Sequence, residues 1–318
     1  MPLQLRRDFA LDSQPRKLLS VDGNHMRIPS DIRKTVVFIG HMETGSPFEP
    51  VGTAFFFAHQ RMLYLVTARH IAEEIAEEPF HFRLTHENGS PIVAYCDPLT
   101  LPNKNVRWFF HDDPTVDVAA LPFGFDWARM GADFEILEAT KAIDRNKDGD
   151  RVETGDFCYV VGLFSLHAGK GRNMPVIHTG HIAMMPDPTE KIPTEDWRNR
   201  SAEIDIEGYL VEISNLQGLS GSPVLVRPTV RLNLTNKGEE TAAVIGGSAH
   251  FYLLGVWQGS WEGRSTMPGP RNEKRVPVGM GIVTPVEKLI ELLNAPAAAE
   301  NRRYWCKETN AKPDGPVA

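Results

Sequence analysis

The sequence has few cysteines: three in 318 residues, namely Cys96, Cys158 and Cys306. An odd number at such wide spacing gives neither a disulfide framework nor the paired ligands of a zinc site, so we expect free thiols. Long apolar runs are also missing, since none approaches the roughly 20 residues that a transmembrane helix needs. We therefore expect no membrane association.

Positive charge is not in excess either. Lys and Arg number 34 against 41 for Asp and Glu, which gives a net charge of −7 at pH 7. Proteins that bind nucleic acid use Lys and Arg to neutralise phosphates, so nucleic acid is not an expected partner. The first residues carry Arg6 and Arg7 but continue with Asp8 and Asp12 instead of the apolar stretch of a secretory signal. These features predict a cytoplasmic protein.

The chain does contain many short apolar runs bounded by Gly, Pro, Asp or Asn. This texture predicts an all-β fold, a sandwich or barrel of mainly antiparallel strands. The expected strands cover residues 36–39, 53–58, 62–67, 106–110, 116–121, 157–163, 176–183, 209–213, 223–226, 252–256 and 278–283.

Two segments predict helices. The first, Ala68 to Glu78, is short and acidic on its outer positions. The second, Thr284 to Leu293, begins Thr-Pro-Val-Glu, which is a capping-box pattern with proline at the first helical position. We expect this second helix to close the folded part of the chain.

The same pattern predicts the domain organisation. Residues 1–33 are polar and form an N-terminal arm, 34–135 form a first β-unit, and 136–294 form a second β-unit with the closing helix. A charged stretch from about residue 126 to 150 links the two units. Residues 295–318, Ala-rich and then polar, form a loosely held tail.

Three short segments carry residue types suited to chemistry. An apolar strand delivers His70 to the start of the first helix, and Asp117 lies in an otherwise apolar run. A buried carboxylate is costly without a donor, so Asp117 needs a hydrogen-bonding partner. Ser220 stands in Gly218-Leu219-Ser220-Gly221, where glycine permits a turn that aims backbone N–H groups inward.

Together these segments resemble the trypsin-like, chymotrypsin-fold serine proteases. The matching motifs are Thr67-Ala68-Arg69-His70, Asp117-Val118-Ala119 and Gly218-Leu219-Ser220-Gly221-Ser222-Pro223, in the order His, Asp, Ser. The resemblance implies two antiparallel six-stranded β-barrels with a C-terminal helix, the first carrying His70 and Asp117 and the second Ser220. It covers roughly residues 35–293 and is closest to the bacterial and intracellular, disulfide-free members.

The resemblance also implies a role for each site residue. Ser220 is the nucleophile, His70 the general base and Asp117 the residue that orients the imidazole, while the N–H groups of Gly218 and Ser220 form the oxyanion hole. The specificity pocket has Ser214 at its floor and Gly279 in its wall. A neutral floor favours cleavage after Leu, Met, Phe or similar uncharged residues.

Further matches and departures accompany these motifs. Val51 to Phe56 resembles the Gly-(Thr/Ser)-Gly-Phe strand of the family, although Ala54 replaces the second glycine. Long polar inserts at about 184–203, 227–247 and 259–275 depart from the family's pattern and leave the substrate-facing loops unpredicted.

Alternatives remain beside the resulting prediction of a serine endopeptidase acting on a protein or peptide substrate. The fold can serve as a catalytically silent binding module, or as a zymogen-like protein that awaits an activating protein partner. No cofactor and no metal are expected. Asp144 to Asp150 is similar to half of a calcium loop, but Gly155 stands where the bidentate acid belongs, and His178 and His181 point to opposite faces of one strand.

Overall fold

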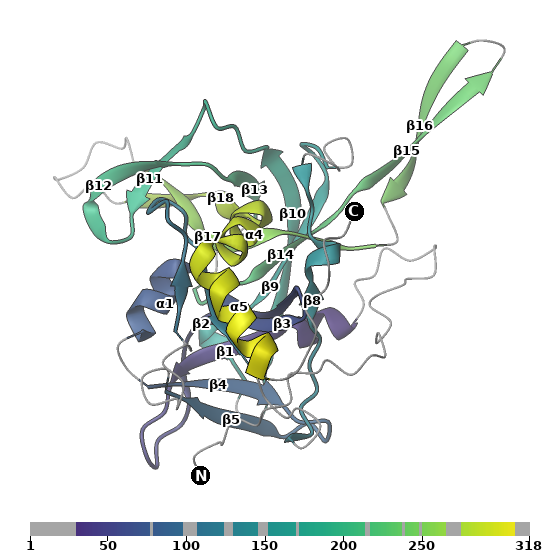
Figure 1. Cartoon of the computed structure of the whole chain (residues 1–318). Coiled ribbons are helices and arrows are strands. Elements are labelled where there is room, and N and C mark those ends of the chain that lie inside the picture. Colours follow the sequence, from purple (N-terminus) through teal and green to yellow (C-terminus); the bar gives the residue numbers. More distant parts are fainter. Residues whose placement is uncertain are drawn as a thin grey trace.

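The computed structural model describes residues 30–76, 79–97, 107–123, 130–145, 152–169, 172–213, 217–236, 239–247, 250–264 and 275–308. Strands dominate these residues, which confirms the predicted all-β class (Figure 1). None of the helices formed by them is long and apolar enough to cross a membrane.

The N-terminal unit is a sheet of eight strands. A 3₁₀ helix, η1 (Ser30–Thr35), leads into it and buries Ile32 in the core, so the last residues of the predicted arm belong to the folded unit. The hydrogen-bonded order is β5-β4-β1-β2-β3-β7-β6, and β8 pairs in parallel with β2. The strands are β1 (Val36–His41), β2 (Glu49–His59), β3 (Met62–Thr67), β4 (Phe80–Thr85), β5 (Pro91–Cys96), β6 (Phe109–Phe110), β7 (Ala119–Pro122) and β8 (Leu137–Glu138).

This unit departs from the expected six-stranded barrel in the number of its strands and in its open order over the described residues. Strands β4, β5 and β8 were not predicted. The alternation in β4, where Phe80, Phe82 and Leu84 are buried, was a usable signal for a strand. A two-residue strand such as β8 carries no period at all, and it forms because the eleven-residue β2 extends far enough to pair with it.

The C-terminal unit is a closed barrel with strand order β10-β13-β18-β17-β14-β9, which confirms the six strands predicted there. Two hairpins, β11–β12 and β15–β16, extend from it, and the second projects away from the body (Figure 1). The segments are β9 (Phe157–Gly162), β10 (Val176–Met184), β11 (Ile192–Asp196), β12 (Asn199–Ile206), β13 (Tyr209–Glu212), β14 (Pro223–Arg227), β15 (Thr229–Asn236), β16 (Glu239–Gly247), β17 (Tyr252–Arg264) and β18 (Arg275–Pro285), with short 3₁₀ helices η2 (Ala139–Lys141) and η3 (Ser165–His167).

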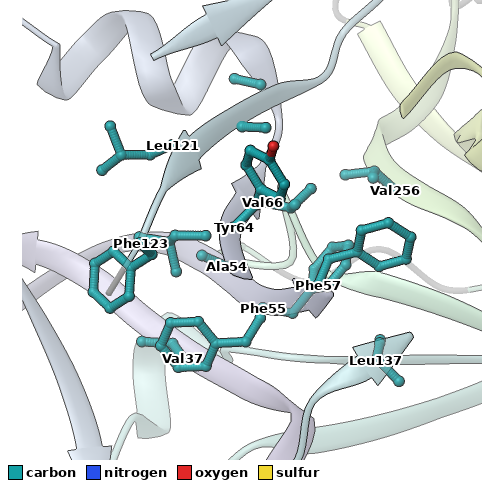
Figure 2. Close-up of a cluster of buried hydrophobic side chains, with 14 of the residues drawn as sticks. Val37, Ala54, Phe55, Phe57, Tyr64, Val66, Leu121, Phe123, Leu137 and Val256 are labelled. Atoms are coloured by element: carbon teal, nitrogen blue, oxygen red, sulfur yellow. The ribbon is translucent and has the colours of Figure 1, made fainter. Parts of the chain in front are cut away.

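Alternating side chains join the two units. In β9, Cys158 and Val160 fill the barrel interior, whereas Tyr159 and Val161 pack into the core of the N-terminal unit. Successive side chains of a strand point to opposite faces, so a strand buried on both faces is apolar throughout. Figure 2 shows Val256 of β17 and Phe57 of β2 as members of one buried cluster. The packing fixes the position of one unit against the other.

The helices differ from the prediction in their ends. Helix α1 (Arg69–Ile75) starts one residue after Ala68, and α4 is Val286–Asn294. The expected capping box at Thr284 was wrong: Thr284 still belongs to β18, and α4 has no side-chain cap. The Thr284 hydroxyl instead donates to the backbone oxygen of Asp117, at 3.4 Å.

The predicted loose tail was also wrong over residues 296–308. They form helix α5 (Pro296–Glu308), which buries Ala298, Asn301, Arg302 and Trp305. The Arg302 guanidinium donates to the Tyr64 hydroxyl and to the Leu293 carbonyl. Contacts with β3 and α4, which no periodic pattern in the segment reveals, hold this helix in place.

Acidification is expected to destabilise the contact between β2 and α4. His59 is 8% exposed, and its Nε2 lies 2.9 Å from Oδ1 of Asn294, while its Nδ1 has no hydrogen-bond partner in the described part of the chain. Burial lowers the pKa of His59 below 6.5. The unfolded chain therefore binds this proton first, and the unfolding free energy should fall as pH drops below about 6.5. Urea melts between pH 8 and 5 measure this, and His59→Gln should flatten the dependence; an equally steep loss in that variant would contradict the assignment.

Candidate active site

His70 and Asp117, which the sequence places 47 residues apart, are in direct contact. Asp117 is fully buried, and its Oδ2 lies 2.8 Å from Nδ1 of His70. The other oxygen of Asp117, Oδ1, accepts a hydrogen bond from the backbone N–H of His70 at 3.0 Å. Both carboxylate oxygens therefore bond to His70, which supplies the donors that the sequence required. Asp117 itself lies just before β7, not inside a strand.

This contact sets the state of the imidazole. An ionised carboxylate only accepts hydrogen bonds, so Nδ1 carries the proton and Nε2 presents a lone pair. Burial lowers the pKa of His70, but the charge and the hydrogen bond of Asp117 outweigh it and raise the pKa above 6.5. The His70 side chain is 24% exposed and can be reached from solvent. The pair thus offers a base whose orientation is fixed.

Ser220 lies in a turn that packs against the end of β3, just before the helix α1 that carries His70. A side chain added at Gly221, where φ is +82°, would strike the Thr53 carbonyl, the Thr67 hydroxyl and the Ala68 nitrogen. The turn therefore approaches the Thr67–Ala68 backbone as closely as glycine allows. The Ser220 hydroxyl donates to the Gln258 carbonyl at 3.2 Å, and no hydrogen bond joins Ser220 to His70. The structure places both side chains on adjoining segments but does not pair them.

The backbone around Ser220 has all its carbonyls engaged. The oxygen of Gln217 accepts the Ser165 N–H at 3.0 Å, and that of Leu219 accepts the Ser222 N–H at 2.8 Å. Thr53 satisfies the two others: its hydroxyl donates to the oxygen of Gly218 at 2.9 Å, and its N–H donates to that of Ser220 at 3.0 Å.

These carbonyls determine where the amides point. In a trans peptide the C=O and the following N–H point in opposite directions, so fixing the carbonyl of Gln217 orients the N–H of Gly218, and fixing that of Leu219 orients the N–H of Ser220. Neither of these two N–H groups donates to another described residue. Gly218 adopts φ +96°, a conformation that glycine tolerates without strain. The turn therefore holds two amides ready for an external acceptor.

The predicted specificity pocket is described only in part. Ser214 lies outside the described residues. Gly279, in β18, is exposed, has φ +78° and has no atom within 4 Å of the place where a Cβ would stand. The space beside Gly279 is therefore open.

One of the polar inserts reaches the site region. Residues 184–203 contribute the β11–β12 hairpin, whose Trp197 indole N–H donates to Oε2 of Glu73 in α1 at 3.4 Å. Oε1 of Glu73 pairs with Arg69, the neighbour of His70. No local sequence pattern indicates this contact, because it joins two units through side chains 124 residues apart. Gln258 and Thr53 also gained no role from the sequence, although Thr53 is a hydroxyl residue in an otherwise apolar run.

The remaining residues with metal or thiol chemistry form no second site in the described part of the chain. No group of three His, Cys, Asp or Glu side chains suited to a metal is found there, and residues 146–150 of the calcium-like loop lie outside it. His181 stacks on Phe157 with ring centroids 4.5 Å apart. Cys96 and Cys158 are free, as predicted, and burial raises the pKa of each to about 12. The side chain of Cys306 is not among those described.

Comparisons with known proteins give distant similarity only. No protein-family model and no curated protein sequence matches the chain. Among solved structures, the active form of the Rv3671c protease from M. tuberculosis is 15% identical with a TM-score of 0.42, covering 82% of this chain and 80% of that one. The inactive form is 15% identical with a TM-score of 0.40, covering 82% and 88%. Similarity at this level assigns no role to any residue, so the chemistry has to follow from the geometry of this chain.

Proposed function

We propose that this protein is a serine endopeptidase that uses Ser220 as nucleophile, His70 as general base and Asp117 as the residue that orients the base. The observation that carries the proposal is the turn at Ser220: the N–H groups of Gly218 and Ser220 donate to no other described residue, and the turn packs against the segment that leads to His70, whose imidazole is held by a buried carboxylate. Acyl transfer requires these three elements together: a nucleophile, a base and donors for an oxyanion.

The proposed reaction proceeds through an acyl-enzyme. Nε2 of His70 takes the proton of Ser220 as Oγ attacks the carbonyl carbon of the scissile peptide bond, and the carbonyl oxygen becomes an oxyanion. The N–H groups of Gly218 and Ser220 donate to it. His70 then gives its proton to the nitrogen of the scissile bond. The C–N bond breaks, and the amine product leaves. Water, deprotonated by His70, attacks the acyl carbon and releases the carboxylic acid and Ser220.

A second candidate is a latent protease, and the orientation of Ser220 favours it. Its hydroxyl donates to Gln258 and has to turn toward His70 before it can lose its proton. Rotation of a serine side chain between staggered positions is a small change, and catalytic hydrogen bonds often form only when substrate is bound. A substrate that breaks the hydrogen bond between Ser220 and Gln258 can therefore let the Ser220 hydroxyl turn toward His70 and complete the site. An activating protein partner is needed only if peptide substrates fail to do so.

Cleavage is expected after uncharged residues such as Leu, Met or Phe. This specificity follows from the sequence resemblance, which implies a neutral residue, Ser214, at the pocket floor and Gly279 in its wall, since a substrate cation would lose hydration there without gaining a partner. Digestion of a peptide library by the full chain, followed by mass spectrometry of the products, measures it. A dominant preference for Lys or Arg would show that an acid such as Glu212 or Glu262 reaches the pocket. Absence of any cleavage would favour the latent or silent alternatives.

A further inference from the structure

Thr53 is an unusual residue for its place. It is fully buried in β2 and is followed by an apolar run from Ala54 to Ala58. A buried hydroxyl is costly unless both its donor and its acceptor capacity are used. Thr53 uses both: its Oγ1 donates to the Gly218 oxygen at 2.9 Å and accepts the Leu163 N–H at 2.8 Å.

The backbone of Thr53 makes further contacts with the same region. Its N–H donates to the Ser220 oxygen at 3.0 Å, and its carbonyl accepts the Thr67 hydroxyl at 2.7 Å, three residues before His70. One residue of the N-terminal sheet is thus bonded to both ends of the Gly218–Ser220 turn and to the last residue of β3, which precedes the helix that carries His70. Its hydroxyl also accepts from Leu163, the residue that follows β9 of the C-terminal barrel.

We infer that the Thr53 hydroxyl is a positioning group that holds the oxyanion-binding turn in its donating orientation. The inference rests on the proposed function. Among the carbonyls of residues 217–220, only that of Gly218 accepts its hydrogen bond from a side chain within the described residues. The other three carbonyls accept from the backbone N–H groups of Ser165, Ser222 and Thr53. The hydrogen bond from the Thr53 hydroxyl is therefore the one that a side-chain substitution can remove. Without it, the Gly218–Leu219 peptide can rotate, and the carbonyl can turn toward the place of the oxyanion.

A pair of variants isolates the hydroxyl. Thr53→Val replaces it by a methyl group of similar size, whereas Thr53→Ser keeps it. We expect Thr53→Val to lower kcat about 10-fold or more with a change in KM below about 3-fold, since a donor aimed at the oxyanion acts in the transition state and losing one outright costs about 10²–10³ in kcat. Thr53→Ser should restore most of the rate.

A matched control separates this role from stability. Thr35 is equally buried, and its hydroxyl donates to the Ile32 carbonyl at 2.7 Å, within the η1 turn. Thr35→Val should lower Tm as Thr53→Val does but leave kcat unchanged. A kcat loss of equal size in both variants would mean that Thr53 is merely structural, and an unchanged kcat in Thr53→Val would overturn the inference outright.

Amide hydrogen exchange tests the Thr53 hydrogen bonds without any measurement of catalysis. Amide hydrogen exchange should become faster at the Leu163 N–H and across residues 217–222 in Thr53→Val, but not in Thr53→Ser or Thr35→Val. Unchanged exchange in that turn would refute the inference even in an active enzyme. If the wild-type chain cleaves no peptide while exchange responds as expected, the positioning role of the Thr53 hydroxyl stands and the proposed function fails.

Discussion

Ser220→Ala should abolish peptide hydrolysis, with kcat/KM falling by about 10⁴-fold or more. The substitution removes only the nucleophilic oxygen, and the backbone of the turn is held by bonds to carbonyls and amides that do not involve it. The hydrogen bond from Oγ to the Gln258 carbonyl is lost, but Gln258 is only partly buried, so the fold should persist. Steady-state kinetics on a cleaved library peptide, with circular dichroism for folding, measure the result.

Ser222→Ala is the matched control for this prediction. Ser222 lies two residues away, is fully buried, and its hydroxyl has no hydrogen-bond partner among the described residues. Removing that hydroxyl should leave kcat/KM within about 2-fold of the wild type, because nothing in the proposed reaction uses it. Residual hydrolysis by Ser220→Ala near the wild-type rate would move the nucleophile to another residue.

Asp117→Asn should lower kcat/KM by about 10⁴-fold and shift its acid limb to lower pH. An amide can donate to Nδ1 and so favour the wrong tautomer of His70, with the proton on Nε2. The limb moves because burial lowers the pKa of His70 and Asp117 is the main group that raises it. The wild-type kcat/KM should therefore rise with pH through an apparent pKa above 6.5, and that of the variant through a lower one.

A second buried aspartate serves as its control. Asp156 stands directly before β9, is 4% exposed, and accepts the Glu153 N–H at 2.9 Å and the Thr229 N–H at 3.0 Å. Asp156→Asn should destabilise the fold while leaving both kcat/KM and its acid limb in place. An unshifted limb in Asp117→Asn would mean that another group titrates in the wild-type profile.

Much of the fold was predictable because both faces of many strands are buried. The apolar runs of β2, β3, β9 and β14 reflect packing inside each unit and between the units, and such runs between turn residues indicate strands from sequence alone. Helix α5 could not be predicted this way. Its buried Asn301 and Arg302 depend on partners from distant elements, which a local pattern does not encode.

The candidate site was likewise predictable in part. The need of Asp117 for a donor followed from the cost of burying a carboxylate, and the structure places His70 on it. The orientation of the Ser220 hydroxyl toward Gln258 could not be anticipated, because it depends on the carbonyl that β17 brings to the turn. The hydrogen bonds of Thr53 to the Ser220 turn could not be predicted for the same reason, since they join the two units.

The most direct test of the central claim is the mass of the protein after treatment with a fluorophosphonate, with peptide mapping of the adduct. Such a reagent labels a serine that a neighbouring base activates and that oxyanion donors surround. The account predicts one adduct per chain, located on Ser220, formed by the wild type and lost in His70→Ala. A folded wild type that forms no adduct, or an adduct on Ser220 that forms equally fast in His70→Ala, would contradict it.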